Sequence, residues 1–113
     1  MTIQELSVTE VKEKLDRGEE FLLLDVREPW EVNIAKIEGS LNIPMDEIPG
    51  RLEELKDRIN NDSASEIVVY CHLGGRSASV SAYLMENGFK NVLNMIGGIK
   101  KWRETVEPAL PQY

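Results

Sequence analysis

Short runs of apolar residues recur along the chain, separated by stretches in which apolar positions repeat with helical spacing. The run at residues 20–25 is continuous and ends in an aspartate, which is typical of a strand buried on both faces. The run at residues 66–70 has the same character. Shorter apolar segments predict strands at residues 41–43 and 91–95. The pattern therefore predicts a buried sheet.

Helices are expected between these strands. Ser7 and Glu10 have the spacing of a capping box, which predicts a helix that ends at Gly18. Pro29 suits the first turn of a short second helix. Apolar residues at helical spacing predict three more helices, over residues 48–59, over 77–87 and around 99–104.

Strands that alternate with helices indicate an α/β fold with a mostly parallel central sheet of about five strands and helices on both faces. With 113 residues the chain has the size of one domain, so we expect residues 1–113 to share one core. In such sheets, ligands bind beyond the carboxyl ends of the strands. A functional site is therefore expected where the strand at 66–70 ends.

Charge and composition limit the partners and the compartment. The formal net charge is −7, so the phosphates of a nucleic acid would be repelled. The single cysteine cannot form an internal disulfide, and the N-terminus lacks the basic and apolar pattern of a secretion signal. The longest apolar run, residues 21–24, is too short to cross a bilayer. We therefore expect a soluble, cytoplasmic protein without a membrane partner.

Metals and cofactors are not expected either. One histidine and one cysteine do not make up a metal site of ordinary ligand count. Gly97 and Gly98 lack the frame of a phosphate-binding glycine motif, so they are interpreted as a tight turn. Trp30 and Trp102 are interpreted as packing residues, and Trp30 is the better candidate for contact with a partner.

The strongest chemical candidate is Cys71, which directly follows the predicted strand at 66–70. A short loop with Gly74 and Gly75 leads from it to a helix that is expected to begin near Ser77. This arrangement aims backbone N–H groups and the positive end of a helix dipole at one point. Those donors favour the thiolate form of a thiol placed there, and Arg76 adds positive charge. The loop therefore predicts a sulfur nucleophile.

Other polar residues are assigned supporting roles. His72 could act as a general base, but neighbouring side chains on a curling loop do not reliably point together, so its backbone amide is expected to matter more. Asp25, Arg27 and Glu28 are interpreted as structural support, with Asp25 and Arg27 bracing neighbouring loops through charged hydrogen bonds.

At this point the sequence resembles the rhodanese-like family of single-domain sulfurtransferases. Four motifs in the matching order carry the resemblance, and together they span nearly the whole chain. They are residues 25–28 with Glu31, residues 37–44, residues 71–77, and residues 97–99 with Trp102.

The resemblance implies a covalent mechanism in two steps. Cys71 would attack the outer sulfur of a donor such as thiosulfate and hold that sulfur as a persulfide, which a thiol, cyanide or a sulfur carrier would then remove. The amides of residues 72–76 and the side chain of Arg76 would form the anion-binding cradle. The residues of this loop are His72, Leu73, Gly74, Gly75, Arg76 and Ser77.

The tail and the loop leave alternatives open. Residues 106–113, following Trp102, are similar to the ending of rhodanese domains fused to ubiquitin-activating-like adenylyltransferases, which implies a ubiquitin-like sulfur carrier as acceptor. Neutral Leu73 favours a second hypothesis, a low-turnover sulfur-relay or regulatory module. A cysteine phosphatase is disfavoured, because its loop has five residues between Cys and Arg, whereas residues 72–75 leave only four here.

Overall fold

The apolar runs form a fully parallel five-stranded sheet in the computed structural model, which describes residues 2–113. The strands lie in the order β1-β5-β4-β2-β3, so the two long apolar runs, β2 and β4, occupy the interior of the sheet. The predicted parallel α/β sheet is confirmed. The strands are β1 Gln4–Leu6, β2 Leu22–Asp25, β3 Leu41–Asn42, β4 Ile67–Tyr70 and β5 Val92–Met95.

Strand β1 is the one strand that the apolar pattern did not predict. It pairs only with β5, in the register Gln4 with Leu93, and it lies at one edge of the sheet. Gln4 and Glu5 are exposed, and only Leu6 is buried. This edge strand pairs with one neighbouring strand and buries only one side chain, so most of its residues face solvent. It therefore has no run of apolar residues.

The helices lie in the predicted places, with two differences in detail. Residues 48–59 were expected to form one helix, but the segment begins as a 3₁₀ helix and continues as an α-helix. Pro49 lies inside that 3₁₀ helix and supplies no backbone N–H, which limits regular α-helical bonding. The helices are α1 Val8–Asp16, α2 Pro29–Ile34, η1 Met45–Arg51, α3 Leu52–Arg58, α4 Gly75–Glu86 and α5 Gly98–Thr105.

The second difference is the start of α4, which begins at Gly75 rather than near Ser77. Gly74 is the N-cap residue, with a φ of 120°. A glycine can adopt this backbone angle without the steric penalty of a Cβ, so the chain turns directly from the loop into the helix. Arg76 and Ser77 therefore lie in the first turn of α4.

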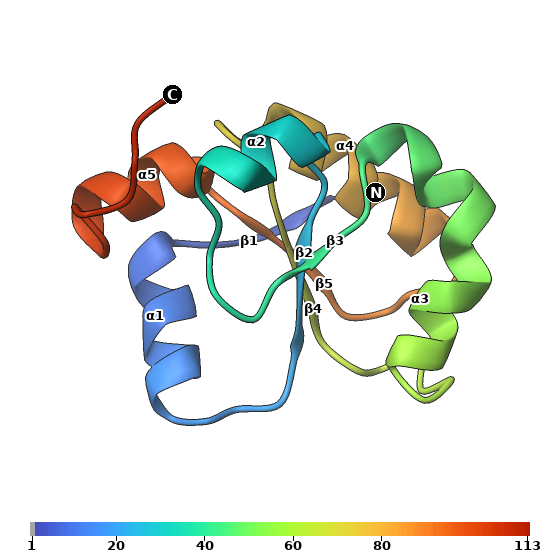
Figure 1. Cartoon of the computed structure of the whole chain (residues 1–113). Helices are drawn as coiled ribbons and strands as arrows, with labels where there is room; N and C mark the ends of the chain where they lie inside the picture. The colour runs from blue at the N-terminus through green and yellow to red at the C-terminus, as the bar shows by residue number, and fades with distance from the viewer. Residues whose placement is uncertain (1) are drawn as a thin grey trace.

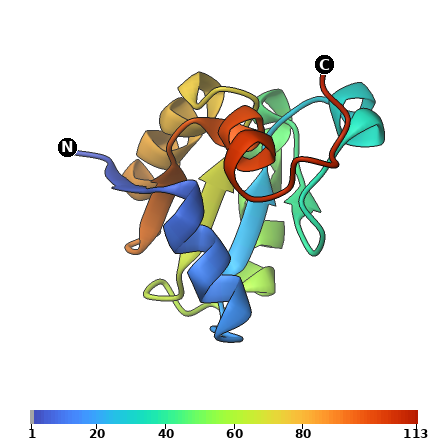
Figure 2. The same ribbon diagram turned by 90° about the vertical axis from the view of Figure 1, so that its left-hand side faces the viewer.

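The sheet is covered on both faces, as predicted (Figures 1 and 2). Successive residues of each interior strand point to opposite faces. Leu24 and Val69 belong to a core cluster that includes residues of η1, α3 and α4. Leu23 and Val68 belong to a second cluster, which includes residues of α1 and α5. None of the helices in residues 2–113 is long and apolar enough to cross a membrane.

The carboxyl ends of β2 and β4 meet at one edge of the sheet, the upper edge in Figure 1. Helix α2 lies over this edge, and α4 and α5 begin there. The chain after α5 runs back to the same edge, so the C-terminus lies near α2 in Figure 2. Residues from both ends of the sequence are thereby brought to one place.

Candidate active site at the carboxyl edge of the sheet

Cys71 directly follows β4 and is buried, with 1% of its surface exposed. Its Sγ accepts hydrogen bonds from the backbone N–H of Gly74, at an N-to-S distance of 3.1 Å, and of Ser77, at 3.4 Å. Gly74 caps α4 but has no side chain that could bind the free N–H groups of the first turn. The cysteine sulfur takes the place of that capping group, so it lies at the positive end of the helix.

The Ser77 hydroxyl is the third polar group at the sulfur. Its Oγ lies 3.3 Å from Cys71 Sγ and 3.2 Å from the carbonyl oxygen of Gly74. The hydroxyl proton can be directed to either acceptor. A protonated sulfur can donate to Oγ, whereas a thiolate can accept the proton of Oγ instead. The serine can therefore serve both protonation states.

Arg76 binds Glu31 of α2 and makes no hydrogen bond to the sulfur among the described residues. Its two terminal nitrogens donate to the two carboxylate oxygens of Glu31 at 2.6 and 2.9 Å. Glu31 is buried, and the pairing with Arg76 lowers the pKa of its carboxyl group from 4.5 to about 2. The bidentate ion pair therefore ties the first turn of α4 to α2.

Asp25 and Arg27 form a second, fully buried ion pair at the end of β2. Arg27 Nε donates to Asp25 at 3.0 Å and Nη2 at 2.7 Å, and Nη2 also donates to the carbonyl of Ala35 at 2.7 Å. Burial disfavours the charge, but the hydrogen bonds to Asp25 and Tyr113 outweigh it and raise the pKa of Arg27. The pair therefore joins β2 to the segment after α2. Glu28, by contrast, is exposed, and its backbone N–H donates to Glu31 at 3.0 Å.

The segment that precedes and includes β3 is fixed against the same edge. The hydroxyl of Tyr70, at the end of β4, accepts from the N–H of Ile37 at 3.3 Å and lies 2.9 Å from the hydroxyl oxygen of Ser40. Burial raises the pKa of Tyr70, so this hydroxyl stays neutral. The Asn42 side chain donates to two carbonyl groups at the end of β2, those of residues 25 and 27, at 3.0 and 2.9 Å.

The carbonyl groups of the loop are held by α5. Ile99 N–H donates to the carbonyl of Cys71 at 2.9 Å, and Lys100 N–H donates to that of His72 at 3.1 Å. A Cβ on Gly98 would lie 2.3 Å from the carbonyl oxygen of His72, so only glycine permits this approach. The tight turn predicted at Gly97 and Gly98 is present, but its role as a support of the loop was not predicted.

His72 contacts the C-terminal segment, whereas Leu73 is exposed to solvent. The His72 ring packs against Tyr113, with ring centroids 4.4 Å apart, and its Nδ1 is buried without a hydrogen-bond partner among residues 2–113. Burial lowers the pKa of His72, which favours the neutral ring. Leu73 is 62% exposed. Trp30, on α2, is 60% exposed, as the sequence suggested.

The structure thus brings Cys71, the rest of the loop and the Asp25–Arg27 pair to one edge. Of the predicted cradle, which comprised the amides of residues 72–76 and the Arg76 side chain, the amide of Gly74 donates to the sulfur. The Ser77 amide also donates to it, whereas the Arg76 side chain binds Glu31 instead. Sequence reasoning missed the roles of two further residues. Glu31 was noted only as part of a motif, and Tyr113 only as part of a tail, because neither carries a local signal for a partner distant in sequence.

Known proteins are similar to this chain in sequence and architecture. Residues 7–105 match the model of the family described as the rhodanese-like domain. A sulfurtransferase of Allochromatium vinosum is 38% identical over 101 residues, which is 88% of each chain. The adenylyltransferase and sulfurtransferase MOCS3 of Arabidopsis thaliana is 35% identical over 118 residues, a match that covers 96% of this chain and 25% of that protein.

The fold has close counterparts among solved structures. The crystal structure of reduced CoADR-RHD from Bacillus anthracis superposes with a TM-score of 0.79 at 35% sequence identity. The match covers 98% of this chain and 18% of that one. The expected α/β architecture is therefore confirmed over nearly the whole length of the chain.

Proposed function

The chain belongs to the rhodanese-like domain family of sulfurtransferases, and we propose that it carries sulfane sulfur on Cys71 from a small donor to a nucleophilic acceptor. One observation carries the proposal. Two backbone N–H groups and one hydroxyl converge on the sulfur of the only cysteine, at the start of a 12-residue helix. Such an environment stabilises a thiolate, which is the nucleophilic form.

The first step loads sulfur onto the protein. Cys71 thiolate attacks the outer sulfur of thiosulfate, a new S–S bond forms, and the S–S bond of thiosulfate breaks. Sulfite leaves with the electron pair of that bond, and the protein retains a persulfide whose terminal sulfur is anionic. The reaction requires no metal, cofactor or external oxidant.

The second step unloads the sulfur. A cyanide ion or a thiolate, from a small molecule or from a sulfur-carrier protein, attacks the terminal sulfur, and the Cys71 thiolate leaves with the electron pair of the S–S bond. With cyanide the product is thiocyanate. The same N–H donors stabilise the thiolate at the start and at the end of the cycle.

Unused donors around the loop support the persulfide. The backbone N–H groups of Leu73, Gly75 and Arg76 make no hydrogen bond within residues 2–113. Those of Gly75 and Arg76 belong to the first turn of α4, whose N–H groups lack partners in the helix itself. The N–H groups of Gly75 and Arg76 are the donors that we assign to the terminal sulfur.

The single cysteine cannot form a disulfide within the chain. We therefore assign the reaction to the cytoplasm, where thiols stay reduced.

Exposed apolar side chains favour a protein acceptor as a second candidate. Leu73 is 62% exposed and Trp30 60% exposed. The rings of Trp30 and of His72, the residue before Leu73, each contact Tyr113. Large exposed apolar side chains beside a functional loop are typical of protein-binding surfaces. A carrier protein that receives sulfur from Cys71 would contact the exposed side chains of Leu73 and Trp30, whereas cyanide or a small thiol would not need them.

Intact mass spectrometry after incubation with thiosulfate tests the proposal. The wild type should gain one sulfur, lose it on addition of cyanide, and release thiocyanate in equal amount. Cys71→Ser should gain none. A wild type without the adduct, or an equal adduct on Cys71→Ser, would contradict the proposal.

The acceptor is identified by comparing two rates. Rapid turnover with thiosulfate and cyanide indicates a free enzyme. Slow turnover, combined with rapid transfer from the loaded protein to a sulfur-carrier protein, indicates the relay. In the relay case, Trp30→Ala should slow transfer to the carrier but not transfer to cyanide, because Trp30 is exposed, lies outside the Cys71 loop, and would contact only a protein acceptor.

A further inference from the structure

Tyr113 joins the two ion pairs that flank the Cys71 loop. Arg27 Nη1 donates to the Tyr113 hydroxyl at 2.7 Å, and the hydroxyl donates to Glu31 Oε2 at 3.0 Å. Glu31 in turn binds Arg76 in the first turn of α4. Arg27 Nη1 also donates to the backbone carbonyl of Glu31, at a longer distance of 3.4 Å. The Tyr113 hydroxyl is therefore the group that connects Arg27 with the carboxylate of Glu31.

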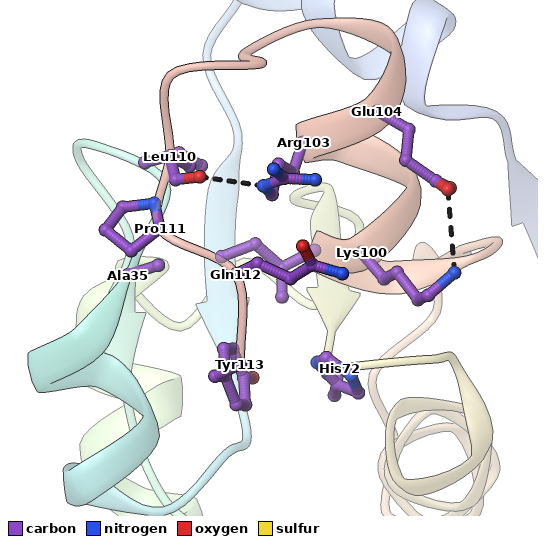
Figure 3. Close-up of a pocket in the computed structure, with 10 residues that line it drawn as sticks. Ala35, His72, Lys100, Arg103, Glu104, Leu110, Pro111, Gln112 and Tyr113 are labelled. Carbon is purple, nitrogen blue, oxygen red and sulfur yellow. Dashed lines mark hydrogen bonds and ion pairs between the residues drawn. The ribbon is translucent and has the colours of Figure 1, made fainter.

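The ring of Tyr113 also lies against the loop itself. Its centroid is 4.4 Å from that of His72 and 6.0 Å from that of Trp30, with the Trp30 ring nearly perpendicular at 80°. Figure 3 shows the side chains of Tyr113 and His72 next to each other, below Gln112. Both line a small cavity of about 40 Å³. The tail thus closes one side of the loop.

We propose that Tyr113 is a positioning residue of the sulfur-transfer site, which it serves by holding Glu31, and through Glu31 the first turn of α4, against the end of β2. The inference rests on the proposed function of Cys71 and extends the site to the C-terminal segment. Tyr113 does not touch the sulfur. It acts on the orientation of Arg76, and thereby on the adjacent N–H of Ser77, which donates to the sulfur.

The charges around the hydroxyl explain why it can hold this position. It accepts from a guanidinium and donates to a carboxylate, and hydrogen bonds with one charged partner are stronger than neutral ones. Burial, the largest cause, raises the pKa of Tyr113 to about 12, so the hydroxyl keeps the proton that it donates to Glu31. Without the hydroxyl, Arg27 and Glu31 would each lose one hydrogen bond but keep their other ion-pair partner.

Tyr113→Phe tests the proposal, because it removes the hydroxyl and keeps the ring. We expect the single-turnover rate of persulfide formation at Cys71 to fall about tenfold, which corresponds to about 1.4 kcal/mol, because Glu31 loses the hydrogen bond from the hydroxyl that holds its carboxylate. The backbone amide NMR signals of Gly74 and Ser77 should shift. Tyr83→Phe is the matched control, since Tyr83 lies further along α4 and packs against the core. It should change neither readout.

A double-mutant cycle with Glu31→Gln separates positioning from general stability. If Tyr113 acts through Glu31, the rate losses of the two single variants should not add in the double variant. Additive losses would overturn the proposal, and so would Gly74 and Ser77 signals that stay unchanged in Tyr113→Phe. Thermal unfolding measures the fraction of unfolded protein in each variant. If that fraction accounts for the whole rate loss, the proposal is overturned too.

The failure of this inference can be told from the failure of the proposed function. If the wild type forms no persulfide with thiosulfate, the proposed function fails. The amide signals then still report whether Tyr113 holds the loop, because they do not depend on any reaction. Unchanged signals in that case overturn the positioning role as well.

Discussion

A missing Cβ decides how closely α5 approaches the Cys71 loop. At Gly98, an added Cβ would lie 2.3 Å from the His72 carbonyl oxygen and 2.6 Å from that of Cys71. These are backbone atoms, and they are already hydrogen-bonded to α5. A side chain at this position cannot be accommodated by a rotamer change, so the loop itself would have to move.

Gly98→Ala should therefore destabilise the protein and slow persulfide formation. We expect a loss of about 2–4 kcal/mol, which combines left-handed backbone strain with the cost of moving the loop. Gly18→Ala is the control, because Gly18 has a φ of 66°, close to the 61° of Gly98, and nothing within 4 Å of the added Cβ. Chemical denaturation should show a clearly larger loss for Gly98→Ala. Equal losses would show that backbone strain alone is responsible.

The Ser77 hydroxyl provides a second prediction for a single residue. Ser77→Ala removes the group 3.3 Å from the sulfur. We expect persulfide formation to slow about 10- to 100-fold, since a hydrogen bond to a charged group contributes about 1.5–3 kcal/mol. Ser81→Ala is the control, because this buried hydroxyl bonds to the Ser77 carbonyl one turn later and not to the sulfur. Stopped-flow or quenched mass measurements give both rates. Equal effects of the two variants would contradict a direct role of the Ser77 hydroxyl.

Two helices from different parts of the chain are joined at the loop by one ion pair. Helix α2 contributes the buried Glu31, and α4 contributes the half-buried Arg76. The two residues are 45 positions apart in sequence, so their pairing closes a large part of the chain around the carboxyl edge of the sheet. The position of α4, and with it the N–H groups at the sulfur, depends on the charge of this carboxylate.

Stability should therefore fall in acid between pH 4.5 and about 2. The pKa of Glu31 is lowered in the folded state, so its contribution is complete above the unfolded value near 4.5 and is lost as the pH approaches about 2. This lowering of the Glu31 pKa corresponds to roughly 3 kcal/mol of free energy of unfolding. Urea unfolding of the wild type and of Glu31→Gln at pH settings of about 5 and about 3, one above and one below the unfolded pKa of 4.5, should show a smaller pH dependence in the variant. Equal dependence would assign the loss to other carboxylates.

At the scale of the whole molecule, Arg27 connects segments that are distant in sequence. Its guanidinium bonds to Asp25 at the end of β2, to the carbonyl of Ala35 after α2, and to Tyr113 near the C-terminus. The side chain is fully buried, and so is its partner Asp25. Removing one member of such a pair leaves the other charge buried without compensation.

Arg27→Met should destabilise the protein by about 3–5 kcal/mol, a large part of the 5–15 kcal/mol that is typical of a domain. Arg51→Met is the control. Arg51 also binds two carboxylates, Glu47 and Glu54, but these pairs are exposed, and we expect a change below about 1 kcal/mol. Thermal or urea unfolding measures both. Similar losses in the two variants would show that burial of the Arg27 pair does not matter.

The sequence was sufficient to predict the helices, strands and loops that have a characteristic pattern in their own residues. The apolar runs of β2 and β4, the capping box of α1 and the glycine loop after Cys71 are all local patterns, and the structure has each in place. Strand β1 was missed because its exposed residues, Gln4 and Glu5, resemble a polar terminus. Its pairing with β5 depends on a partner near residue 94, which no local pattern reveals.

The supports of the site were less predictable than the proposed nucleophile. Cys71 could be singled out as a candidate because strand, loop and helix adjoin it in sequence. The contact between Tyr113 and Glu31 joins residues 82 positions apart, and Gly98 meets the loop from a different element. Such contacts follow from the assembled fold and from side-chain geometry. A pattern along one segment can single out such residues, but it does not show which distant residues they contact in the folded chain.

The burial of Cys71 has a consequence for handling the protein. Two copies can be cross-linked through their thiols only if their Cα atoms approach within about 7 Å, which covered sulfur atoms do not permit. Folded chains should therefore run as monomers on a non-reducing gel even after mild air oxidation. Covalent dimers on such a gel would report how much of a preparation has lost its native structure.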